Sequence, residues 1–263
     1  MRRWLGLMLA LGAGFAAAAP QLDPTLVSGL AYHERPGAQV PLQLVFRDAD
    51  GQIRSLGEQL HGLPMILIPA YFNCPNLCSV VRASLFEALR STGFRAGRDY
   101  TLAVISIDPQ ETSTDARDAL ARDRAAFDLP GSAQGWHYLT GAVENIHAVA
   151  DAIGFRERRD AHSREFLHPA GLIFLTPRGV VSSYLLGVGY TPVQVRAAVE
   201  RANAGTLAAV ASPVLLLCFH FDATTGRYSL EIMKLIRLAG LLTVVTLGTM
   251  LWLLRRRPKG ARP

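Results

Sequence analysis

The sequence predicts an α/β body between two hydrophobic end segments. Short apolar runs such as residues 65–68 and 102–107 are typical of buried strands. Between them, apolar residues recur at the three- and four-residue spacing of amphipathic helices. The chain also begins and ends with uncharged stretches next to arginines, which are typical of targeting and membrane segments. We therefore expect one mixed domain of strands alternating with helices, held between a leader and an anchor.

The first half of the body is expected to contain a β-hairpin followed by two strand-helix units. Residues 42–46 and 53–56 flank the turn Asp48-Ala-Asp-Gly51, which is a hairpin signal. A buried strand over residues 65–68 leads into a helix that ends at Gly93. Apolar positions mark the face of that helix: Leu77, Val80, Val81, Leu85, Ala88 and Leu89. The strand over residues 102–107 leads into a second helix with an apolar side formed by Ala116, Ala119, Leu120 and Phe127.

The second half continues the alternation. Residues 136–139 form a weak third strand, and residues 172–175 and 180–186 form two strands around the turn Thr176-Pro-Arg-Gly179. The motif Thr191-Pro-Val-Gln194 is a capping box that starts a last helix. The helix after the third strand is marked by Val143, Ile146, Ala150 and Ile153.

Two cysteines in Cys74-Pro-Asn-Leu-Cys78 directly follow the first buried strand. If they open a helix, residues at i and i+4 share a face with Cβ atoms about 5–6 Å apart, whereas a disulfide prefers about 3.8 Å. Pro75 suits the first helical position, which places the Cys74 thiol at the positive end of the helix dipole and favours thiolate. We expect a reactive pair that can hold a metal ion between two thiolates or close to a disulfide.

The order of elements, hairpin, βα, βα, βα, ββα, predicts a thioredoxin-like fold with an N-terminal β-hairpin. Three motifs then resemble the Sco/SenC family of copper-binding assembly factors: Cys74-Pro-Asn-Leu-Cys78, the segment Ile105-Ser-Ile-Asp108-Pro109, and a histidine nine residues before a Pro-x-Gly turn. The resemblance covers about residues 40–203. It implies one copper ion, bound by both cysteines and that histidine, and a role in building the dinuclear copper centre of cytochrome c oxidase.

The histidine of this ligand set is His168, which stands nine residues before Pro177. His162, in Asp160-Ala-His-Ser163, resembles the local motif of the family but would need a six-residue slip in register. The metal ligands predicted through the resemblance are therefore Cys74, Cys78 and His168.

The residue types themselves favour a soft, thiophilic ion. Two thiolates and an imidazole suit Cu(I), and Cu(II) stands at the top of the divalent affinity order, so copper in either state is the expected cargo. Zinc usually takes a fourth ligand, and none is evident nearby in the sequence. Asp108 either orients a ligand or caps the helix that follows.

Charge and hydropathy predict where the chain lies. Seven of the basic residues lie outside residues 4–254, which leaves 20 basic against 21 acidic residues between these bounds. This part of the chain therefore lacks the net positive charge that nucleic-acid-binding proteins usually carry. The terminal arginines instead follow the positive-inside rule. We expect a protein of the bacterial inner membrane with its domain in the periplasm. The expected segments are a signal peptide (residues 1–19), an N-terminal extension (20–39), the thioredoxin-like domain (40–204), a linker with an apolar segment (205–235), a transmembrane helix (236–254) and a cytoplasmic basic tail (255–263).

Two other functions stay open. The chain could be a thiol:disulfide oxidoreductase that uses Cys74 and Cys78 as its catalytic redox pair to keep the copper-ligand cysteines of a partner reduced. It could also be a membrane-tethered redox or copper sensor. A peroxidase is disfavoured because Tyr71 stands where a threonine would be expected. The third cysteine, Cys218, and its neighbour His220 form an isolated Cys-x-His in an apolar segment, for which a buried thiol is the favoured interpretation.

Overall fold

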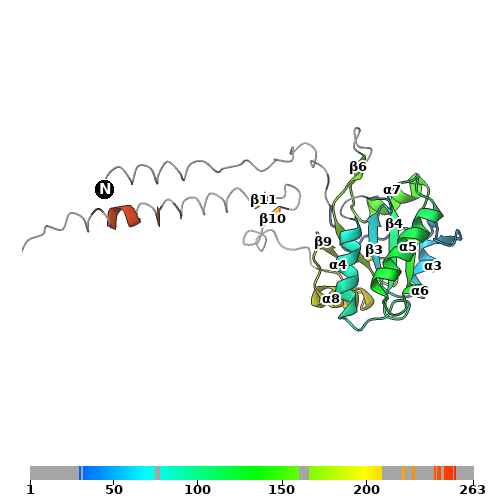
Figure 1. The fold of residues 1–263 in the computed structure, drawn as a ribbon. Coiled ribbons are helices and arrows are strands. Elements are labelled where there is room, and N and C mark those ends of the chain that lie inside the picture. The colour runs from blue at the N-terminus through cyan, green and yellow to red at the C-terminus, as the bar shows by residue number, and fades with distance from the viewer. Residues whose placement is uncertain are drawn as a thin grey trace, which may run out of the picture.

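A computed structural model describes the domain in residues 32–74, 78–159 and 166–208. It also describes residue 30 and a few short stretches near the C-terminus, at residues 221–222, 227–228, 240, 242–243, 246–250 and 252. The domain is built around a five-stranded sheet with helices packed on it (Figure 1). The order of its strands is β5-β4-β3-β8-β9.

The three strands on one side of the sheet are parallel. These are β3 (Met65–Ala70), β4 (Thr101–Ser106) and β5 (Trp136–Leu139). They are joined by the helices α4 (Cys78–Arg90) and α5 (Ser113–Phe127), which lie next to each other across the front of the sheet in Figure 1. Every residue of β3 and β4 is buried, which explains why their sequences are continuous apolar runs.

The other two strands run as an antiparallel pair. They are β8 (Gly171–Leu175) and β9 (Val181–Leu186), and β8 is antiparallel to β3. The helix α8 (Pro192–Asn203) packs against α4 and β9 (Figure 1). Its predicted capping box is confirmed, because Thr191 accepts from the backbone of Gln194 and Gln194 accepts in return.

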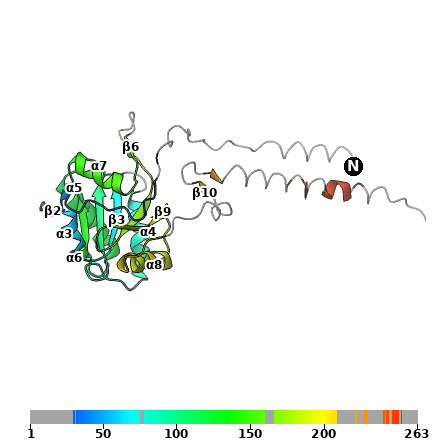
Figure 2. The same ribbon diagram turned by 180° about the vertical axis from the view of Figure 1, so that it is seen from behind.

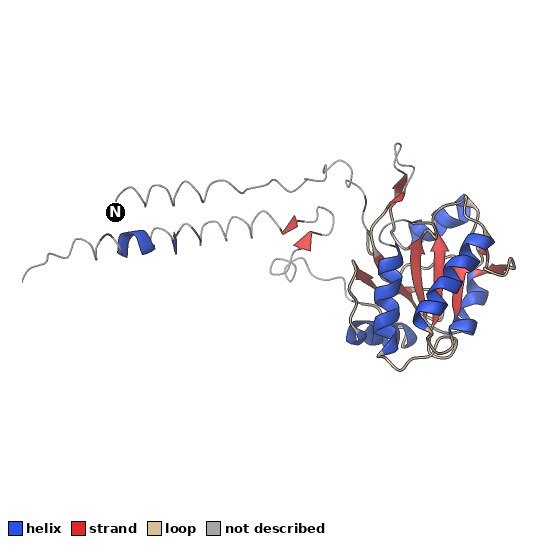
Figure 3. Cartoon of the chain, viewed as in Figure 1, coloured by secondary structure: helices blue, strands red, loops and turns tan. Residues whose placement is uncertain are grey.

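The remaining elements surround the sheet. The predicted hairpin is confirmed as β1 (Val45–Arg47) and β2 (Ile53–Ser55), and the helix expected from Val143 is α7 (Val143–Ala152). Four short elements of the domain were not predicted: α3 (Leu56–Leu60), α6 (Ser132–Gly135), and the pair β6 (Arg158–Arg159) and β7 (Phe166–Leu167). Seen from behind, β6 and α7 lie at the same end of the domain (Figure 2). Figure 3 shows the arrowheads of the parallel strands pointing to that end.

Aromatic packing fixes the helices to the front of the sheet. The ring of Phe86, on α4, stacks on Trp136 of β5 at a centroid distance of 4.3 Å. Phe127, on α5, lies 5.1 Å from the same Phe86 ring. Such pairs add specific geometry to the burial of large apolar surfaces. The packing holds α4, whose first described residue is Cys78, in a fixed position over β3 and β5.

The C-terminal part of the chain contains two further strands, β10 (Phe221–Asp222) and β11 (Arg227–Tyr228), which pair with each other. The described residues between 240 and 252 are helical. Over the described residues, no helix is both long and apolar enough to cross a membrane. Cys218 and His220 lie outside the described residues.

Candidate functional site: a cysteine and histidine pair at the end of the sheet

The candidate site forms where β3 ends and β8 begins. These strands are antiparallel, with Leu67 opposite Ile173, so the carboxyl end of β3 and the amino end of β8 meet at one end of the sheet. Pro69 lies beyond the last paired residue of this ladder and cannot donate a backbone hydrogen bond. β3 continues along β4 to Ala70, and β8 is paired with β9 from Gly171, so the loop that leads to Cys74 and the segment that precedes β8 leave the sheet at the same end.

The central contact joins Cys78 to His168. The Sγ atom of Cys78 lies 3.3 Å from the Nε2 atom of His168, which is 90 residues away in the sequence. The Nδ1 atom of His168 lies 3.1 Å from the carbonyl oxygen of Pro169, which can only accept, so Nδ1 carries the proton. The Nε2 lone pair of the neutral ring therefore faces the thiol, where it can accept the thiol proton or bind a metal ion.

Aromatic rings surround His168 and limit its contact with water. Tyr71 lies edge-on at a centroid distance of 6.1 Å, and Phe155 lies at 5.8 Å. Phe166 extends this wall, 5.7 Å from Tyr71. Burial lowers the pKa of His168, because a charged imidazolium would lose its hydration there. The ring is thus kept neutral, which is the form that binds metals.

Cys78 is a buried thiol, with an exposed fraction of 2%. Burial raises the pKa of Cys78 to about 12, and a hydrogen bond with the Cys74 side chain acts in the same direction. The Tyr71 backbone and the charge of Arg82 oppose this shift. Cys78 therefore remains protonated near neutral pH, and a metal ion would have to displace its proton.

Cys74 borders this pair from a more open position. It is half-buried, and both cysteines are reduced thiols. Cys74 itself is not helical, and the described part of α4 begins at Cys78, so the prediction that both cysteines share one helix face stays a prediction. The predicted effect of the helix dipole on the Cys74 thiol likewise stays a prediction, because it depends on where the helix begins. Pro75 lies outside the described residues.

Arg82 lies one helical turn below Cys78 and is 4% exposed. Its Nη1 atom donates to the Cys78 carbonyl at 3.3 Å, and its Nε atom donates to Asp123 at 2.7 Å. The hydroxyl of Tyr138 donates to the same Asp123 oxygen. This buried cation was not recognised in the sequence, because an arginine within an amphipathic helix normally indicates its solvent-facing side.

Glu111 was also not identified from the sequence. Its carboxylate contacts the loop that leads from β3 to Cys74, because it accepts hydrogen bonds from the backbone amides of Phe72 and Asn73. Asp108, for which two roles were expected, instead accepts from the Gln110 backbone at 2.9 Å within the turn after β4. The helix that follows is capped by Thr112 and Asp115.

The other histidines in the described part of the chain do not lie at this site. His61 and His137 face each other at a centroid distance of 5.9 Å beside β5, and His33 and His147 are exposed. His162 lies outside the described residues. In the part of the chain that the structure describes, no three Cys, His, Asp or Glu side chains converge closely enough to hold a metal ion. Cys78 and His168 are thus the assembled part of the site, and Cys74 borders it.

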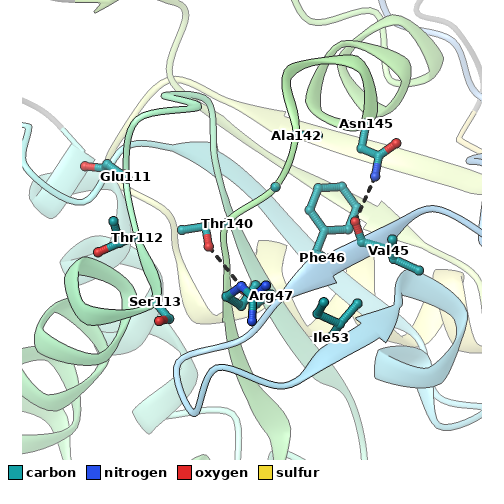
Figure 4. A pocket seen from close by; sticks show the side chains of 11 residues that line it. Val45, Phe46, Arg47, Ile53, Glu111, Thr112, Ser113, Thr140, Ala142 and Asn145 are labelled. Carbon is teal, nitrogen blue, oxygen red and sulfur yellow. Dashed lines mark hydrogen bonds between the residues drawn. The ribbon is translucent and has the colours of Figure 1, made fainter.

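A pocket of about 460 Å³ lies away from the cysteines, beneath the β1–β2 hairpin (Figure 4). Its walls come from the hairpin, from the turn before α5 and from the start of α7. Asn145 closes one side by donating to the Val45 carbonyl at 2.9 Å, and Thr140 lies against Arg47 on the other. Glu111 stands at the rim of this pocket, and its carboxyl group points away from the hairpin (Figure 4).

The fold and the site define a thioredoxin-like domain in which a thiol pair meets a neutral histidine. A family model described as SCO1/SenC matches residues 34–203, and the chain belongs to that family. No curated protein matches the chain.

Solved structures share the fold of this domain. Two proteins from Aquifex aeolicus VF5, described as candidate electron transfer and electron transport proteins, are 25% and 26% identical, with TM-scores of 0.57 and 0.54. Each match covers 65% of this chain, and 95% and 99% of the two structures. Arabidopsis thaliana ScoI, solved with copper bound, has the same fold at 17% identity and a TM-score of 0.50, covering 62% of this chain and 96% of that one.

Proposed function

We propose that this protein is a membrane-tethered copper chaperone. It binds one copper ion through Cys74, Cys78 and His168, and it delivers the ion during assembly of the copper centre of cytochrome c oxidase. The observation that carries this proposal is the 3.3 Å contact between the Cys78 thiol and the unprotonated nitrogen of His168. The copper bound to the related Arabidopsis ScoI supports it.

The donor set suits copper. Soft thiolates select Cu(I), and an imidazole suits both Cu(I) and Cu(II). His168 needs no proton loss to bind, because its Nδ1 proton is held by the Pro169 carbonyl and its Nε2 atom is already a lone-pair donor. Cys78 must lose a proton, and the nearby charge of Arg82 favours the resulting thiolate. Loading with copper is therefore coupled to release of thiol protons.

The two thiols are unequally exposed, which suggests an order of transfer. Cys78 is 2% exposed, whereas Cys74 is only half-buried. A ligand of an incoming partner reaches Cys74 first and replaces it on the ion, while Cys78 and His168 still hold the copper. Cys74 is therefore the exchangeable ligand at entry and at delivery.

The tether belongs to the same proposal. Residues 236–254 anchor the chain in the inner membrane, with the basic tail in the cytoplasm and the domain in the periplasm, as the flanking arginines favour. The copper-bearing subunit of the oxidase would present its ligands on that side of the membrane.

A second candidate function is reduction of a partner's disulfide. It is favoured by the Cys74 side chain, which forms a hydrogen bond with Cys78. In this reaction the two thiols give two electrons and two protons to the partner's disulfide and become a disulfide themselves. His168 would not be required, so it separates the two functions.

Cells that lack this chain test the proposal. We expect them to lose cytochrome c oxidase activity, and we expect the wild-type chain to restore it. His168→Ala should fail to restore activity if the protein delivers copper. Full restoration by His168→Ala, together with failure of Cys78→Ser, would favour the reductase and contradict the chaperone.

A further inference from the structure

A buried carboxylate lies under the loop that carries Cys74. Glu111 is 9% exposed and accepts three hydrogen bonds. Its Oε1 atom accepts from the Asn73 amide at 2.7 Å, and its Oε2 atom accepts from the Phe72 amide at 2.8 Å. The Ser106 hydroxyl donates to Oε2 at 2.6 Å. Two of the three donors are thus the backbone groups that directly precede Cys74.

These contacts replace the hydrogen bonds that the loop gives up when it leaves the sheet. The last sheet-like bond here runs from the Ile107 amide to the Ala70 carbonyl at 2.8 Å. Beyond that point the buried backbone amides need other acceptors. Glu111 supplies them from the turn after β4, and Asp115 adds a contact of 3.0 Å to the Asn73 side chain.

We propose that Glu111 is a positioning residue of the copper site, holding the Phe72 and Asn73 amides so that Cys74 stands next to Cys78. This inference rests on the copper-binding function proposed above. Ligands held in place before the ion arrives bind more tightly, because less conformational freedom is lost on binding.

The chemistry requires a carboxylate at this position. All three partners of Glu111 are donors, so both of its oxygens must accept. In Glu111→Gln one oxygen becomes an NH₂ group that would face a backbone N–H, and at least one amide loses its acceptor. Burial raises the pKa of Glu111, while the same three hydrogen bonds act to lower it. The loop therefore helps to keep the buried carboxylate ionised, and the carboxylate holds the loop.

The side chain faces the cysteine loop, although Glu111 also borders the pocket under the hairpin. In Figure 4 its carboxyl group points away from the hairpin residues Phe46 and Arg47. The neighbouring residues Thr112 and Ser113 line the pocket as well. A substitution of Glu111 therefore acts first on the loop.

The test compares Glu111→Gln with wild type in the full-length chain, loaded with Cu(I) and challenged with a Cu(I) chelator. We expect Glu111→Gln to release copper about 10- to 100-fold faster, as for other groups that orient metal ligands. Alkylation of the metal-free protein, followed by mass spectrometry, should show a changed rate at Cys74 with little change at Cys78. Glu144→Gln, an exposed position in the first turn of α7, is the matched control and should behave as wild type.

Glu111→Asp and Ser106→Ala separate positioning from folding. Glu111→Asp keeps a carboxylate and should recover part of the slow release, and Ser106→Ala removes one of the three donors and should give a smaller increase than Glu111→Gln. Wild-type release rates in a folded Glu111→Gln protein would overturn the inference. If Glu111→Gln does not fold, wild-type rates in both milder variants would overturn it. Failure of the wild-type chain to bind copper would instead contradict the proposed function.

Discussion

Arg82 and Asp123 form an ion pair of 2.7 Å beneath the candidate site, with side chains that are 5% and 13% exposed. Asp123 also accepts from Tyr138, so three elements, α4, α5 and β5, meet at one carboxylate. The pair fixes the first turns of α4, where Cys78 lies. Removing one partner of a buried ion pair destabilises the fold far more than removing one partner of a surface pair, because the other charge is left buried and uncompensated.

The first prediction concerns the removal of one partner. Asp123→Ala leaves the Arg82 guanidinium buried without its counter-charge, so it should reduce the free energy of unfolding by about 3–5 kcal/mol. Glu87→Ala breaks the exposed pair with Arg90 and should cost less than about 1 kcal/mol. Denaturant unfolding of both variants measures the difference. Equal, small losses would show that the pair beneath Cys78 is not a structural anchor.

The second prediction separates copper binding from thiol chemistry. His168→Ala should weaken copper retention strongly, because it removes the neutral nitrogen that faces Cys78. Thiol exchange with a small disulfide should stay close to wild type, since exchange depends on the thiolate and on access to it. His147→Ala, at an exposed histidine, is the matched control. If His162→Ala has the larger effect on copper, the predicted histidine register is wrong.

The third prediction concerns acid. Burial lowers the pKa of His137 to about 4, and the nearby His61 adds to this shift. The folded protein therefore resists protonation at His137, whereas the unfolded chain gains a proton below about pH 6.5. The stability that neutral His137 contributes is complete above pH 6.5 and is lost as the pH falls toward 4, by at most about 3 kcal/mol.

Denaturant unfolding between pH 7 and pH 4 measures this contribution. His137→Asn should show a smaller loss of stability over that range than wild type, and His147→Asn should follow the wild-type curve. Parallel curves for wild type and His137→Asn would assign the acid sensitivity to other groups.

The fourth prediction concerns topology. Reporter enzymes that are active only after export should work when fused after Asn203 and fail when fused after Arg262, because the cationic tail favours the cytoplasmic side. The reverse pattern would place the thiols in the cytoplasm. That result would undercut both the proposed location and the role in oxidase assembly.

Most of the sheet could be predicted from the sequence because its strands are buried on both faces. The apolar runs of β3 and β4, and the turn Thr176-Pro-Arg-Gly179 between β8 and β9, leave few other interpretations. The helix α3 could also have been found, since Ser55 and Glu58 form a capping box that was overlooked. The strands β6 and β7 contain two residues each, too few to give a periodic pattern.

The cysteines and the histidine of the candidate site could be predicted from the sequence, but the residues that hold them in place could not. Cys78 and His168 stand out through the motif and the register of the Pro-x-Gly turn. The roles of Glu111 and Arg82 depend on contacts with residues 38 to 41 positions away in the sequence, which no local pattern reveals. The predicted helix start at Pro75 stays a prediction, because residues 75–77 lie outside the described residues.

The most direct test of the copper-chaperone proposal is a copper titration of the reduced full-length protein, compared with its serine variants. We predict one copper ion per chain in the wild type and loss of binding in both Cys74→Ser and Cys78→Ser. A double variant, Cys74→Ser with Cys78→Ser, that retains one tightly bound copper ion per chain would contradict the account.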